Sequence, residues 1–183
     1  GKIDDIIKNK VNENVNATLD FVDADLSLFS NFPNATVTLE KVSLVNKAPF
    51  EGDTLFAANA VELKLGISQF FKESDEPIKI DRFFVDGANV NVKADSEERA
   101  NYDIAMDTGS AETESTASES SFTLAMDEYS IQNSKIVYDD RSTNMNLTIT
   151  ELNHSGSGDL SLATSELDTK TTAFVSFGMD STN

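Results

Sequence analysis

One stretch decides the fold of this chain: Phe83-Phe84-Val85-Asp86-Gly87-Ala88-Asn89-Val90-Asn91-Val92. A second stretch repeats its pattern, reading Tyr129-Ser130-Ile131-Gln132-Asn133-Ser134-Lys135-Ile136-Val137-Tyr138. In each copy, alternating apolar positions lead to Gly87 or Asn133, and a second alternating segment follows. Glycine and asparagine tolerate positive φ, so both positions suit a bend or a bulge. Residues 83–104 and 129–149 therefore predict two strand–turn–strand units, and such units build an extended sheet through pairing between neighbours.

Composition narrows the class of protein. The 183 residues are 39% hydrophobic and include 12 Phe, which is enough for one folded core. The formal net charge of −18 repels nucleic-acid phosphates, so nucleic-acid binding is not expected. The chain has no Cys, which excludes disulfides, thiolate metal sites and cysteine nucleophiles. We attribute the acidity to solvation of exposed strands rather than to a specific cation partner.

Hydrophobic periodicity predicts one helix followed by many strands. Over residues 3–13 the apolar residues Ile3, Ile6, Ile7 and Val11 follow helical spacing. A short helical turn is expected at 68–72, with Ser68 as its cap and Phe70-Phe71 packed beneath the sheet. The remaining segments alternate with period two. Strands are expected at 17–21, 37–39, 42–44, 61–67, 83–86, 89–94, 122–128, 129–132, 134–139, 144–150, 159–163 and 171–178, with another beginning at 78.

The domain organisation follows from a change in composition. Residues 107–121 are acidic, rich in Ser and Thr and free of large apolar residues, which predicts a disordered loop. This loop separates a β region with a leading helix (1–106) from a continuation of the same sheet (122–183), which we expect to be truncated at its C-terminus. The predicted fold class is α+β and mostly β, with a curved, twisted antiparallel sheet in a single structural domain.

The sequence gives only weak evidence for catalytic or metal-binding residues. His154 lies in a Ser/Gly-rich segment that is typical of a hairpin, so we interpret it as a turn histidine rather than as a general base. Carboxylate pairs such as Asp139 and Asp140 resemble a glycosidase site, but 32 acidic residues make such pairs unavoidable. The acids at 23–25 and 95–98 match no calcium-binding loop. We therefore expect a non-catalytic protein without a metal or another cofactor.

The alternating apolar face has two interpretations. It is either a core closed by a helix or a second sheet, or a hydrophobic trough for acyl chains. Period alone does not decide between them, because it does not show what covers the face.

An ordered series of segments adds a family resemblance. The segments are 26–39 (Leu-Ser-Leu-Phe-Ser-Asn-Phe-Pro-Asn-Ala-Thr-Val-Thr-Leu), 42–46, 50–55, 78–80, 85–92 and 100–104 (Ala-Asn-Tyr-Asp-Ile). In this order and spacing the chain resembles the N-terminal region of the AsmA family of bacterial envelope proteins, over residues 14–106.

The resemblance implies a function and a location. The family is similar to TamB and to chorein-type bridge-like lipid-transfer proteins, whose curved sheets form a long hydrophobic groove. It implies a role in outer-membrane biogenesis, with phospholipid carried between membranes of a Gram-negative bacterium. It also implies a periplasmic location and an inner-membrane helix upstream of Gly1, and it offers no catalytic residues to transfer. The expected partners are phospholipid acyl chains and the inner membrane.

The groove wall is predicted from the alternating positions. The candidates are Leu19, Phe21, Leu39, Leu44, Leu63, Leu65, Val90, Val92, Leu147, Ile149 and Phe174, with others in phase. The alternative function is a secreted or cell-surface β-module that binds protein or glycan and whose apolar face is closed.

Overall fold

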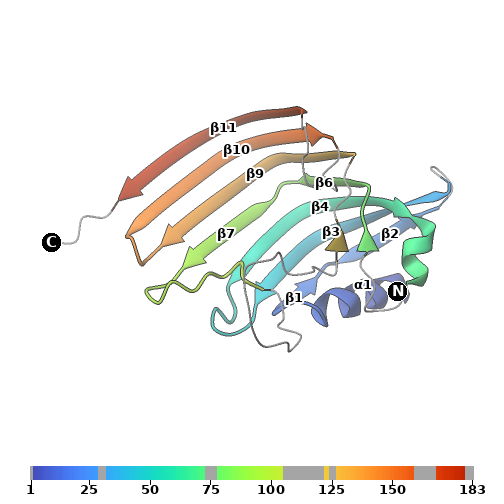
Figure 1. Ribbon diagram of the computed structural model, residues 1–183, viewed down its shortest axis with the longest axis horizontal. Helices are drawn as coiled ribbons and strands as arrows, with labels where there is room; N and C mark the ends of the chain where they lie inside the picture. Colours follow the sequence, from blue (N-terminus) through green and yellow to red (C-terminus); the bar gives the residue numbers. More distant parts are fainter. Residues whose placement is uncertain are drawn as a thin grey trace, which may run out of the picture.

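A computed structural model describes residues 2–28, 32–72, 78–104, 122–123, 127–158 and 168–179. Its main feature is one nine-stranded sheet that arches over a single α-helix (Figure 1). The predicted class, α+β and mostly β, is confirmed. The expected loop at 107–121 and the strand at 159–163 lie outside the described residues.

The helix forms where the apolar spacing predicted it, as α1 (Lys2–Asn12). Asp4 and Asp5 lie in its first turn and Lys10 in its last, which suits the helix dipole. The strands are longer than the sequence pattern indicated, because expected neighbours such as 37–39 and 42–44 form one strand. They are β1 (Ala17–Asp20), β2 (Asp23–Ser27), β3 (Asn34–Asn46), β4 (Thr54–Gly66), β6 (Arg82–Asp86), β7 (Asn89–Ala94), β9 (Glu128–Asp140), β10 (Met145–Ser157) and β11 (Asp168–Met179).

The strand order across the sheet is β1-β3-β4-β6-β9-β10-β11, with β2 beside β3 and with β7 between β4 and β9. Most neighbours are antiparallel, as predicted, but β6 and β7 both pair with β9 in parallel. The sheet is therefore mixed rather than wholly antiparallel. A parallel neighbour needs a crossover connection, and the chain between β7 and β9 is long enough to supply one. A separate parallel pair joins β5 (Ile78–Lys79) to β8 (Phe122–Thr123).

The two copies of the sequence repeat lie side by side. Phe83 pairs with Tyr129 and Val90 with Ile136, so one register holds along the whole parallel contact. Gly87 and Asn133 take the same place in the two copies, and both have positive φ, at 64° and 49°. The expectation of a bend or bulge at these two residues is confirmed.

Four of the residues with positive φ lie on one line across the sheet. Lys41 in β3 (φ 53°) and Glu151 in β10 (φ 50°) continue the line of Gly87 and Asn133. At Lys41 the buried positions change from odd numbers (Val37, Leu39) to even ones (Val42), so the apolar residues stay on one face. Without this change of phase, half of the apolar residues would turn to the opposite face of the sheet.

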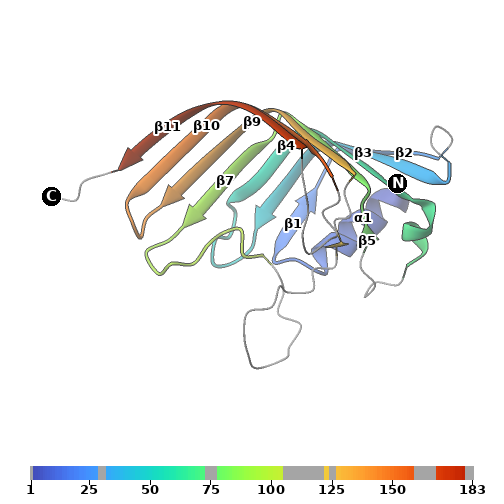
Figure 2. The same cartoon turned by 45° about the horizontal axis from the view of Figure 1, so that its top comes forward.

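The hydrophobic core lies on the concave face, between the sheet and α1. It is built mainly from β3, β4 and β6, and Ile7 of α1 packs against it. Figure 2 shows α1 and β5 beneath the arch. The buried members are Phe21, Val37, Leu39, Val42, Ala58, Val61, Leu65, Val85 and Ala88.

The short helical turn differs from its prediction in two respects. It is a 3-10 helix, η1 (Ile67–Phe71), which follows Gly66 and has no side-chain cap, so the assignment of Ser68 as its cap was wrong. Phe70 packs against the core as expected, whereas Phe71 points outward and is 82% exposed. The tight 3-10 turn places the two adjacent rings on different sides of the helix.

The buried Asn101 connects the segment after β7 to the sheet through hydrogen bonds. The Asn101 side chain donates to the carbonyl of Asn91 at 2.6 Å and accepts from the amide of Lys93 at 2.8 Å. Its backbone carbonyl accepts from Nδ2 of Asn46 at 2.7 Å. Because Asn101 is 1% exposed, these bonds replace water at a buried position.

The line of positive-φ residues gives a first prediction. We expect Asn133→Val to be less stable than Asn133→Gly by about 1–3 kcal/mol, since a β-branched residue is strained at this φ and glycine is not. Both variants lose the bond from Asn133 Nδ2 to Asp86 Oδ1 (2.8 Å), so the difference between them isolates the backbone term. Urea denaturation measures it, and equal stability of the two variants contradicts the role given to this φ.

A half-open apolar face as the candidate functional site

Apolar side chains cross the whole sheet in register. One row runs through Leu19, Leu44, Phe56, Val90, Ile136, Ile149 and Val175, each paired with the next. A parallel row runs through Val92, Tyr138, Leu147 and Phe177. Directly paired residues share a face of a sheet, so both rows lie on the concave face with the core.

The part of these rows on the outer strands is the candidate site, which we call the open lane. It consists of Val90, Val92, Ile136, Tyr138, Leu147, Ile149, Val175 and Phe177. Helix α1 lies beneath the same concave face but packs against β1 and β2, at the edge of the sheet opposite β11. Val175 and Phe177 on the edge strand β11 are 64% and 59% exposed, and the other lane residues are half-buried.

The structure divides the predicted wall residues into three groups. The open lane contains four of them: Val90, Val92, Leu147 and Ile149. Most of the others belong to the core or pack against it: Leu19, Phe21, Leu39, Leu63 and Leu65. Leu44 pairs with Leu19 and is half-buried beside them.

Phe174 falls outside both groups. It pairs with Thr150, next to Ile149, and therefore points to the opposite face. The sequence offered no sign of this, because Phe174 and Val175 are adjacent apolar residues and either one can fill the inward position. Several residues in phase with the predicted wall were not named from the sequence: Phe56, Ile136, Tyr138 and Phe177.

Beyond Asn133 and Glu151 the concave face of the outer strands carries a cluster of polar side chains beside Ile131. Tyr129 Oη lies 2.9 Å from His154 Nε2, and His154 Nδ1 lies 2.7 Å from Thr171 Oγ1. The Tyr129 ring covers Gly156, where an added Cβ would lie 2.5 Å from ring atoms. His154 is thus a strand residue within β10, and its interpretation as a turn histidine was wrong. Its hydroxyl partners do not form the acid–base–nucleophile chain of a hydrolase.

At its opposite end the lane borders Asp140, which pairs with Met145. The Asp140 side chain is buried and accepts hydrogen bonds from Ser142 Oγ at 2.6 Å and from the Ser142 amide at 2.8 Å. These bonds lower the pKa of Asp140 to about 2, with the Ser142 hydroxyl as the largest cause. Tyr138 Oη donates to the same carboxylate at 3.2 Å. Burial and this carboxylate together raise the pKa of Tyr138.

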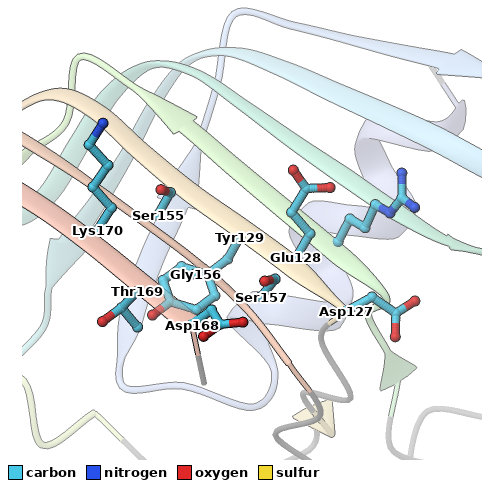
Figure 3. A pocket seen from close by; sticks show the side chains of 10 residues that line it. Asp127, Glu128, Tyr129, Ser155, Gly156, Ser157, Asp168, Thr169 and Lys170 are labelled. Carbon is cyan, nitrogen blue, oxygen red and sulfur yellow. The ribbon is translucent and has the colours of Figure 1, made fainter. Parts of the chain in front are cut away.

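A shallow hollow on β9, β10 and β11 is a separate feature (Figure 3). Its charged lining includes Arg82, Glu128, Asp168 and Lys170. By register these residues alternate with Tyr129 and Gly156, which places their side chains on the face opposite the lane. Mixed charge on the outward face of a half-covered sheet is typical of a solvated surface.

Two carboxylates, one at the end of β6 and one after β7, have structural partners. Asp86 accepts from Asn133, and Asp95 forms an ion pair with Arg99 at 2.7 Å. Within the part of the chain that the structure describes, no three His, Asp or Glu side chains form a group able to hold a metal.

A scan of protein families matches the AsmA family model over residues 2–173. The chain belongs to the AsmA family. The match extends well beyond residues 14–106, so the later strands of this AsmA protein, β9 and β10, are also family structure. No curated protein and no solved structure matches the chain.

AsmA proteins are bacterial envelope proteins, which places this chain in an envelope family. Among the described residues of this AsmA protein, no helix is both long and apolar enough to cross a membrane.

The acid at the end of the lane gives the second prediction. Because folding lowers the pKa of Asp140, its ionised form stabilises this AsmA protein above about pH 4, and that contribution is lost as the pH falls from 3.8 towards 2. We expect Asp140→Asn to be less stable than the wild type at pH 7 and to lose less stability between pH 4 and pH 2. Thermal unfolding across this pH range measures both effects.

Asp139→Asn is the matched control. Asp139 is the adjacent carboxylate, and its contact with Arg141 is long, at 3.9 Å. The Asp139→Asn profile should follow the wild type, and an Asp140→Asn profile with the wild-type acid dependence contradicts the assignment.

Proposed function

We propose that this chain is the non-catalytic periplasmic part of an inner-membrane-anchored AsmA protein that carries phospholipid between the membranes during outer-membrane biogenesis. The open lane is the part of the chain that contacts the acyl chains. Membership of a bacterial envelope family supports the setting.

The observation that carries the proposal is the continuity between the core and the lane. The row that begins at Leu19 and Leu44 beside the helix continues without a polar residue to Val175 at the sheet edge. Among the described residues, α1 covers the part of this face near β1 and β2, and the part on the outer strands is left for another apolar partner. Contiguous exposed apolar surface is typical of a binding site, and Val175 and Phe177 expose most of their area.

The chemistry of the lane favours an acyl chain as the occupant. Its only polar side chain, Tyr138, already donates to Asp140, so the lane offers area rather than directional bonds. Each methylene removed from water contributes about 0.8 kcal/mol wherever it lies on such a surface. A lipid tail can therefore bind and still slide along the rows, which a carrier requires and a close-fitting pocket would prevent.

No catalytic step is part of this proposal. The His154 cluster and Asp140 have structural roles, in covering Gly156 and in holding the β9–β10 turn, respectively. The anchor expected before Gly1 and the envelope partners belong to the proposal as well.

The proposal predicts a difference between two phenylalanines on one strand. Phe177 faces the lane and Phe174 faces away, and they are 59% and 66% exposed, so a change to Ser should disturb folding little at either position. We expect Phe177→Ser combined with Val175→Ser to lower the phospholipid that co-purifies from bacteria by about tenfold, through lost apolar contact. Native mass spectrometry of the purified protein measures the bound lipid.

Phe174→Ser is the matched control, and its lipid content should equal that of the wild type. Two outcomes contradict the proposal: equal loss in both variants, or lipid-free wild-type protein. Lipid-free protein that binds an extended peptide along the β11 edge would instead support the β-module alternative.

A further inference from the structure

Two exposed phenylalanines lie at the end of the strands opposite the open lane. Phe32 precedes β3 and is 80% exposed, and Phe71 ends η1 and is 82% exposed. The two segments are joined, because the Ile67 amide donates to the Pro33 carbonyl at 3.1 Å and Asn34 pairs with Gly66. We call this end, residues 32–34 and 67–71, the tip.

The tip differs from the rest of the surface in charge. Residues 26–39 contain no Asp, Glu, Lys or Arg, and neither do residues 65–71. The whole chain is 25% charged, with a net charge of −18. Both charge-free segments contribute to the tip, so removing the two rings from water does not require a charged side chain of these segments to be desolvated.

The shape and size of the tip suit a lipid bilayer better than a protein partner. Two phenylalanines can bury at most about 500 Å², and a stable protein interface buries about 800 Å² on each partner. Aromatic rings on a protruding turn and a short helix can instead enter the boundary between headgroups and acyl chains, which lies about 5–10 Å deep. The missing charge matters here too, because a charged tip would resist that insertion.

We propose that the tip is a membrane-contact site, with Phe32 and Phe71 inserted into the surface of a phospholipid bilayer. The inference does not rest on the lipid-carrying role of the lane, since it uses different residues at the other end of the strands. It gives the molecule an orientation, with the tip on a bilayer and the lane held away from it.

Tryptophan fluorescence tests the position of the rings, because the chain has no native Trp. Phe32→Trp and Phe71→Trp each introduce a single probe at the tip. Val22→Trp is the matched control, since Val22 is 78% exposed between β1 and β2, away from the tip. With vesicles of phosphatidylcholine brominated in its acyl chains, we expect quenching of both tip probes and no quenching at position 22. Quenching at position 22 equal to that at the tip overturns the proposal.

Vesicle co-sedimentation tests the contribution of the rings. Neutral phosphatidylcholine is the probe, because the charge of −18 would oppose an anionic surface. We expect Phe32→Ser combined with Phe71→Ser to lower the partition coefficient about tenfold or more, and Val22→Ser to leave it unchanged. Circular dichroism confirms that each variant is folded. Wild-type protein that stays in the supernatant overturns the proposal, as does a double variant that binds like the wild type.

The lane variant Phe177→Ser separates this proposal from the proposed function. It should bind vesicles as the wild type does, while the tip variants should keep their co-purified lipid. If the wild type carries no lipid but its tip probes are quenched, the lipid-carrying role fails and the contact site stands.

Discussion

The structure depends on keeping apolar side chains on one face of strands that bend. A regular strand alternates its side chains, and a single step out of phase sends every later apolar residue to the wrong side. Lys41 in β3, Gly87 between β6 and β7, Asn133 in β9 and Glu151 in β10 make the correction, each through a left-handed backbone conformation. Because these residues line up across the sheet, the sheet bends along one line and the concave face stays continuous from β1 to β11.

That continuity lets one face serve two purposes. Near β1 to β4 it closes against α1 and forms the core, with residues such as Leu39 and Val61 buried. On β9 to β11 the same rows continue beyond the helix and remain accessible. The proposed lipid site needs no separate pocket, because it is the part of this apolar face that α1 does not cover. The large negative charge of the chain favours solubility despite this exposed apolar area.

Most of the architecture could be predicted from the sequence, and the errors have physical causes. The repeat predicted the neighbouring copies and the bends at Gly87 and Asn133, since few residues accept positive φ. It did not predict that the copies are parallel, because direction depends on the connection between them. Phe174 was misplaced because the bulge between Thr150 and Asn153 decides which of two adjacent apolar residues points inward. His154 was read as part of a turn because Gly and Ser are common in turns, whereas here Gly156 makes room for the ring of Tyr129.

The sequence by itself determined the α+β class, the leading helix and the AsmA family, because periodicity and ordered motifs are properties of the chain alone. Only the tertiary structure decided which apolar residues are sealed and which are open. Burial depends on what packs above a face, and α1 packs mainly against β1, β2 and the core beside them. Tertiary contacts also brought Phe32 and Phe71 to one tip, through pairing between β3 and β4 that no local pattern contains.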